Sequence, residues 1–129
     1  MAAMKPFGRK PTDSELAILR VLWTRGPSTV RQVAESLDRE AGYTTVLKLL
    51  QIMTEKGLVV RDESERTHVY QAAYTEDQTQ KQLVTDLLDR AFDGSAAKLV
   101  LQALASNKAS PQELDDIRKL LNKQRGGAR

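Results

Sequence analysis

The chain contains no cysteine and a single histidine, His68, among its 129 residues. Without thiols it forms no disulfide, no thiolate metal site and no cysteine nucleophile. It also lacks a Gly-rich phosphate loop, a paired-carboxylate motif and a nucleophile elbow, so no set of residues suggests catalysis. We therefore predict that the protein is not an enzyme and uses no metal or cofactor. The absence of cysteine is typical of a cytoplasmic protein.

Long apolar runs are also missing from the sequence. No stretch of about 18 consecutive apolar residues occurs, so we expect no membrane insertion. Residues 1–10 carry Lys5, Arg9 and Lys10 without an apolar segment, which is unlike a secretory signal and predicts a flexible basic arm. The net charge of +3 permits contact with nucleic acid without requiring it. Whether the protein binds nucleic acid must therefore be judged from where its charged residues lie.

Two segments near the start show helical periodicity. Thr12 and Glu15 form a capping-box pattern ahead of the first, whose apolar positions are Leu16, Leu19, Val21, Leu22 and Trp23. Residues 25–27 end this helix, because they include Gly and Pro. Ser28 and Thr29 are predicted to cap a second, short helix with the inner face Val30, Val33, Ala34 and Leu37.

A third helix is predicted from Tyr43 or Thr44 to Lys56, followed by Gly57 as a left-handed C-terminal residue. Its apolar face consists of Val46, Leu49, Leu50 and Met53. The period then changes to that of strands at residues 58–61 and 68–71, with a polar tip between them. Three helices followed by such a hairpin are typical of a winged helix-turn-helix domain, which we place at residues 11–75.

Helical periodicity returns after this domain and predicts three further helices within residues 76–124. Residues 93–95 separate the first two, and a capping box at residues 110–113 opens the last. The middle helix carries Leu99, Val100, Ala103 and Leu104. The other two have apolar faces too large for helices standing alone, and we expect these to form a dimerisation domain through Leu83, Leu87, Leu88, Phe92, Leu114, Ile117, Leu120 and Leu121. The fold class is thus mainly α with a small β-hairpin, and residues 125–129 are expected to form a tail.

The outward face of the third helix is the strongest functional signal. With the apolar positions turned inward, the outward residues are Thr44, Thr45, Lys48 and Gln51, and no acidic residue of the helix precedes Glu55. Hydroxyl, amide and ammonium groups can contact base edges in the major groove, and a helix N-terminus favours a phosphate. An ordinary solvated helix face fits the same residues about equally well.

Other candidate DNA contacts lie beside this helix. Arg31 and Thr29, near the start of the second helix, are suited to a phosphate, although capping is the simpler role for Thr29. Arg66, at the hairpin tip, is a further candidate, while two nearby glutamates would oppose contact. Tyr43 either stacks on a sugar or supports the turn before the third helix.

Three blocks of the sequence together resemble the BlaI/MecI penicillinase-repressor family, which also includes the copper-responsive CopY repressors. Residues 12–23 contain Glu15, Leu19 and Trp23 at intervals of four, residues 42–58 contain Tyr-Thr-Thr-Val, and Val-Tyr follows at 69–70. The resemblance covers nearly the whole chain. It implies a homodimeric winged-helix repressor that binds a palindromic double-stranded DNA operator, with Thr44, Thr45 and Lys48 reading the groove.

Two departures bear on how such a repressor would be released from DNA. In members linked to β-lactam resistance, a membrane metallopeptidase sensor triggers cleavage at an Asn-Phe bond, and this chain has Gln102-Ala103 there. The C-terminal cysteine cluster of the copper-responsive members is absent. The resemblance therefore leaves a metallopeptidase sensor as a candidate partner, but it does not predict copper sensing or cleavage at this bond.

A second function class is a winged-helix module that binds a protein partner through its C-terminal helices and leaves DNA untouched. Retention on heparin or on a mixed-sequence duplex, with a steep dependence on salt, distinguishes a DNA-binding protein from such a module.

Overall fold

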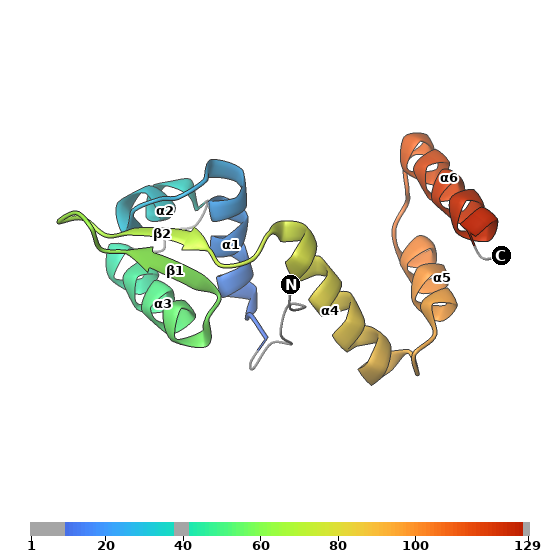
Figure 1. Ribbon diagram of the computed structural model, residues 1–129, viewed down its shortest axis with the longest axis horizontal. Coiled ribbons are helices and arrows are strands. Elements are labelled where there is room, and N and C mark those ends of the chain that lie inside the picture. The colour runs from blue at the N-terminus through green and yellow to red at the C-terminus, as the bar shows by residue number, and fades with distance from the viewer. Residues whose placement is uncertain (1–9, 38–41, 128–129) are drawn as a thin grey trace. The chain divides into compact units, whose positions relative to one another are not determined.

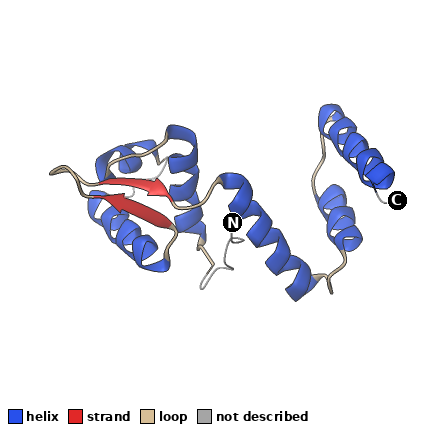
Figure 2. Cartoon of the chain, viewed as in Figure 1, coloured by secondary structure: helices blue, strands red, loops and turns tan. Residues whose placement is uncertain are grey.

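Figures 1 and 2 show a computed structural model that describes residues 10–37 and 42–127. The elements are α1 (Asp13–Arg25), α2 (Val30–Ser36), α3 (Tyr43–Lys56), β1 (Val59–Asp62), β2 (Val69–Ala72), α4 (Glu76–Ala91), α5 (Ala96–Ser106) and α6 (Pro111–Gly127). They form two compact units, one ending at Thr85 and the other starting at Asp86. The mainly α fold with one hairpin is confirmed. Apart from Lys10, the expected basic arm lies outside the described residues.

The core of the first unit lies between the inner faces of α1, α2 and α3 and the hairpin (Figure 1). On α1 the most deeply buried apolar residue is Ile18, which the periodicity analysis omitted, whereas Trp23 packs at the edge of the core. Ile18 shares a face with Leu22 because residues four apart lie above one another on a helix. The buried apolar residues are Ile18, Leu19, Leu22, Val30, Val33, Val46, Leu50, Met53, Leu58, Val59 and Tyr70.

The helix starts of this unit follow the predicted capping chemistry with one correction. Thr12 and Thr29 each accept a hydrogen bond from the N–H of the residue three positions later, and both form capping boxes. Ser28 does not cap α2. Its side chain is buried and donates to the Gly26 carbonyl at 2.8 Å, while its backbone pairs with Tyr70 in an isolated antiparallel bridge. Ser28 thus extends the small sheet beyond the hairpin.

The two strands begin and end one residue later than the sequence predicts. Gly57 takes the left-handed conformation, with φ of 82°, and the N–H of Leu58 bonds to the Met53 carbonyl at 2.9 Å. The Gly57 N–H also bonds to the Thr54 carbonyl, at 3.1 Å. The two bonds together form a Schellman motif, so Leu58 belongs to the helix end and not to a strand. The antiparallel register then pairs Val59 with Ala72 and leaves residues 63–68 as the tip.

Helix α4 starts on the first unit. The indole N–H of Trp23 donates to the Tyr74 carbonyl at 3.0 Å, and Thr79, in the second turn of α4, is buried. Thr75 and Gln78 form a further reciprocal pair of capping bonds. These contacts fix the direction in which the chain leaves the hairpin.

The second unit contains the end of α4 with α5 and α6. Asp93 and Gly94 adopt positive φ at the expected break, and the Ser95 hydroxyl caps α5. Ser110 and Glu113 cap α6 reciprocally, as predicted. Helix α6 continues to Gly127, past the start of the expected tail at residue 125. Across the two described stretches of chain, no helix is both long enough and apolar enough to cross a membrane.

Candidate nucleic-acid interface

The exposed face of α3 carries the four residues that the periodicity placed outward. Thr44, Thr45, Lys48 and Gln51 are exposed, whereas Val46, Leu50 and Met53 on the opposite side are completely buried. The two faces differ because α3 packs mainly against α2 and β1. The helix therefore presents hydroxyl, ammonium and amide groups to its surroundings, and contact with DNA remains a prediction for each of these residues.

The N-terminus of α3 has no side-chain cap among the described residues. Its N-cap residue is Gly42, which has no side chain to accept hydrogen bonds from the first turn. At the starts of α1 and α2, by contrast, a threonine oxygen accepts one of these bonds. The partial positive charge of the first-turn N–H groups of α3 thus lies next to Thr44 and Thr45, where a phosphate would be favoured.

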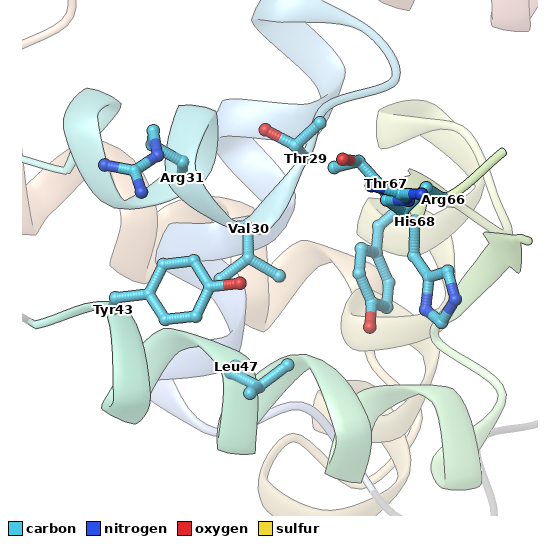
Figure 3. Close-up of a pocket in the computed structure, with 9 residues that line it drawn as sticks. Thr29, Val30, Arg31, Tyr43, Leu47, Arg66, Thr67 and His68 are labelled. Atoms are coloured by element: carbon cyan, nitrogen blue, oxygen red, sulfur yellow. The ribbon is translucent and has the colours of Figure 1, made fainter.

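A hollow of about 430 Å³ lies between α2, the first half of α3 and the hairpin (Figure 3). Its lining residues are Thr29, Val30, Arg31, Tyr43, Leu47, Arg66, Thr67, His68 and Tyr70. Figure 3 shows Arg31 above Tyr43 on one side and Arg66 on the hairpin side. The hollow thus brings together four of the predicted DNA contacts, Thr29, Arg31, Tyr43 and Arg66. The other four lie on the open face of α3 and do not line it.

Arg31 and Tyr43 form a cation–π contact across the hollow's edge. The guanidinium carbon of Arg31 lies 5.9 Å from the centre of the Tyr43 ring, within the range in which the ring quadrupole attracts a cation. Tyr43 is half exposed, at 51%. Two roles were left open for Tyr43: stacking on a sugar and supporting the turn before α3. The contact with Arg31 adds a third role, because the Tyr43 ring supports the arginine of the neighbouring helix.

Thr29 has the capping role that was the simpler expectation. Its hydroxyl oxygen accepts the N–H of Gln32 at 3.1 Å, and the Gln32 side chain accepts the Thr29 N–H at 2.9 Å. A hydroxyl that accepts a bond still has its own hydrogen to donate. Capping and contact with a phosphate are therefore compatible at this position.

The acidic groups of the hairpin are partly neutralised within the hairpin itself. Arg61 Nε donates to Glu63 at 2.6 Å. The pKa of Arg61 is raised, mainly by its hydrogen bond with Tyr70 and also by the one with Glu63. The Ser64 N–H bonds to the Asp62 carboxylate and lowers the pKa of Asp62. Of the two glutamates expected to oppose contact with DNA at the hairpin tip, Glu63 therefore has a cationic partner.

Leu47 lines the hollow but was not among the residues singled out from the sequence. It is half-buried and lines the hollow between Tyr43 and the hairpin. Spacing contained the signal, because Leu47 follows Tyr43 by four residues and is out of phase with the Val46–Leu50–Met53 face.

The second unit exposes most of its apolar side chains. No described side chain after Thr79 is buried. Of the eight predicted dimerisation residues, Leu87, Leu114, Leu120 and Leu121 are exposed and the other four are half-buried. The large exposed apolar residues of this unit that the prediction omitted are Val100, Leu101 and Leu104, all on α5, and Val84 of α4 is a further one at the end of the first unit.

Three helices, a hairpin packed on them and an exposed polar face on the third helix define a winged-helix DNA-binding regulator of transcription. Residues 11–123 match the family described as "Penicillinase repressor", and the chain belongs to this family. Because its members are transcriptional repressors, the protein is a repressor and not an enzyme.

Three relatives illustrate the match. "Transcriptional regulator BlaI" of Mycobacterium tuberculosis is 34% identical over 112 residues, which cover 84% of this chain and 80% of that protein. "Penicillinase repressor" of Bacillus licheniformis is 21% identical over 85% of this chain and 88% of its own length. "Methicillin resistance regulatory protein MecI" of Mammaliicoccus sciuri is 18% identical over 87% of this chain and 93% of its own length.

Proposed function

We propose that the protein represses transcription as a homodimer that places two α3 helices in the major groove of a palindromic operator. The observation that carries this proposal is the exposed polar face of α3 beside a hollow lined by two arginines. This arrangement offers base-reading groups and phosphate-binding groups side by side, which is the division of roles found in sequence-specific DNA binding.

Thr44, Thr45, Lys48 and Gln51 would read the bases. Lysine donates to the acceptors of guanine, glutamine pairs with adenine, and a threonine methyl packs on the methyl of thymine. The N-terminus of α3, which carries no side-chain cap in the described part of the chain, would bind a backbone phosphate and set how deeply the helix enters the groove.

Arg31 and Arg66 would bind backbone phosphates on either side of the hollow. Contact with Tyr43 restricts Arg31 before DNA arrives, so less side-chain entropy is lost on binding. Thr29 would add a hydroxyl donor at the same edge. These contacts carry no sequence information, but they would fix the register of α3 on the duplex.

The exposed apolar residues support pairing of two chains through the second unit. Helices of this length are marginal in water unless an apolar face is buried, and no described side chain after Thr79 is buried in the single chain. A second copy would cover the exposed leucines of α4 and α6 and those of α5. Pairing would also hold the two α3 helices about 34–36 Å apart, which is one turn of DNA.

Release from DNA would follow separation of the two chains. If a membrane metallopeptidase sensor acts on this protein, helical structure would protect the Gln102-Ala103 bond from cleavage, because both residues lie within α5. A protease binds an extended segment, so α5 would have to unfold locally first.

The test is selection of duplexes from a randomised library by the wild-type protein. We expect enrichment of a palindromic sequence, two chains per duplex, and an affinity that falls steeply as salt rises. If the protein enriches no sequence and leaves heparin at low salt, it does not bind DNA. The competing hypothesis, a module that binds a protein partner, would then hold.

A further inference from the structure

A buried ion pair joins the last residue of α3 to the first turn of α1. Lys56 Nζ lies 2.8 Å from Glu15 Oε1, and the two side chains are only 8% and 3% exposed. The same carboxylate oxygen accepts the Thr12 N–H at 2.9 Å as part of the α1 capping box. Helix α3 is thus joined by a charged hydrogen bond to the start of α1, 41 residues away in sequence.

A contribution to folding stability does not by itself explain why Glu15 and Lys56 form a buried pair. Two buried charges lose their hydration, and their mutual attraction often only balances that loss. Buried pairs replaced by apolar residues of similar volume are frequently as stable or more stable. What a directional bond adds, and an apolar contact does not, is one preferred position of the two helices.

The pair lies where it can control the direction of α3. The C-terminal end of the helix is held by Met53 in the core and by the Gly57 and Leu58 hydrogen bonds. Its opposite end carries the exposed Thr44 and Thr45. Thr44 is about 18 Å along the axis from Lys56. A tilt of about 10° at Lys56 would therefore move Thr44 by about 3 Å, the length of a hydrogen bond.

We propose that the Glu15–Lys56 pair is a positioning device that sets the angle of α3 on α1, and through it the selectivity of the protein for its operator over other DNA. The inference rests on the proposed function, since selectivity requires that α3 reads bases. Phosphate contacts made by Arg31 and Arg66 do not depend on this angle to the same degree. The pair therefore acts on selectivity more than on binding to mixed-sequence DNA.

The test uses the double variant Glu15→Gln/Lys56→Met. Glutamine keeps the acceptor of the capping box, and methionine keeps the length of the buried side chain without its charge. The matched control is Asp77→Asn/Lys81→Met, which removes an exposed ion pair from α4 with the same change in charge. Two quantities are compared with those of the wild type: the melting temperature, and the ratio of affinities for the selected duplex and a mixed-sequence duplex.

We expect the double variant to melt within a few degrees of the wild type and to lose about tenfold in that ratio, the effect of one displaced base contact. The control should keep both quantities. A double variant that unfolds, or that folds and keeps full selectivity, would overturn the proposal, because the pair would then be structural.

A second measurement on the DNA-free protein separates this inference from the proposed function. Residual dipolar couplings of the α3 amides, referred to those of α1, report the angle between the two helices. We expect them to change in the double variant and not in the control. Unchanged couplings would overturn the positioning role, whereas a wild-type protein that ignores DNA but shows changed couplings in the variant would overturn the proposed function alone.

Discussion

Lys48 is the charged residue at the centre of the exposed face of α3. We predict that Lys48→Ala weakens binding to the selected duplex by about 1–3 kcal/mol, because the ammonium contact with a base edge or phosphate is lost. Folding should not change, since the side chain is exposed and lies outside the core. Fluorescence anisotropy of a labelled duplex measures the loss.

Lys81→Ala is the matched control for this change. It removes the same charge from an exposed position on α4, where Lys81 pairs with Asp77 at 3.3 Å. Equal losses from both substitutions would mean that Lys48 contributes only to the net charge and does not contact DNA.

Tyr43 acts through Arg31 in the proposed interface. We predict that Tyr43→Leu lowers affinity for selected and mixed-sequence duplexes alike, because Arg31 loses the ring that holds it over the hollow. Tyr43→Phe keeps the ring and should bind as the wild type does. A loss in the phenylalanine variant would instead assign the contact to the hydroxyl of Tyr43. Titrations over a range of salt concentrations distinguish these outcomes.

Residues whose roles depend on local spacing were predictable from the sequence. Thr12, Glu15 and Thr29 cap helices as expected, because a capping box needs only residues three positions apart. The pairing of Glu15 with Lys56 was not predicted, and Lys56 was interpreted only as part of a helix end. That partnership depends on how two helices pack, which the local pattern does not encode.

At the scale of elements, the end of α3 determines where the hairpin begins. Gly57 has φ of 82°, a conformation that costs a residue with a Cβ about 1–2 kcal/mol, although a Cβ there would meet no atom within 4 Å. We predict that Gly57→Ala destabilises the fold by about 1 kcal/mol through the backbone alone. Urea unfolding measures the change.

Gly126→Ala is the control for this substitution. Gly126 lies in helix α6, where a Cβ also meets nothing within 4 Å, and alanine is the better helix former. We expect no loss of stability there. Equal destabilisation at both positions would contradict the strain assigned to Gly57.

The same helix end explains why the predicted strands were displaced by one residue. Val-rich segments predict a strand, but periodicity does not show that Leu58 completes the Schellman motif before the strand starts. The order of helices and hairpin was predictable because each element buries apolar residues at its own period. The residues at which elements begin and end were less predictable, because hydrogen bonds at the helix caps determine them.

Helix α5 exposes large apolar residues that the predicted dimerisation residues did not include. The most exposed of its large apolar residues is Leu101, at 65%. We predict that Leu101→Glu shifts the protein from dimer to monomer and weakens operator binding, because a charge would be buried at the pairing surface. Gln102→Glu adds the same charge at the next residue of α5 and serves as the control. Sedimentation equilibrium at several concentrations measures the shift.

At the scale of the whole molecule, the proposed function assigns DNA reading to the first unit and pairing of two chains to the second. The first unit has a closed apolar core and offers polar groups on α3, whereas the second offers apolar groups on every described helix. Periodicity predicted apolar faces on the helices of both units, because apolar residues recur at helical spacing before and after the hairpin. It did not predict which apolar residues stay exposed, since that depends on the packing of helices within one chain.

The most direct test of the account compares duplexes in which base pairs are inserted between the two halves of the selected palindrome. Inserting about five base pairs turns the half-sites to opposite sides of the helix. We predict that two wild-type chains bind the uninterrupted palindrome together, and that this insertion reduces the affinity to that of a single half-site. Unchanged affinity, or one chain per duplex, would contradict it.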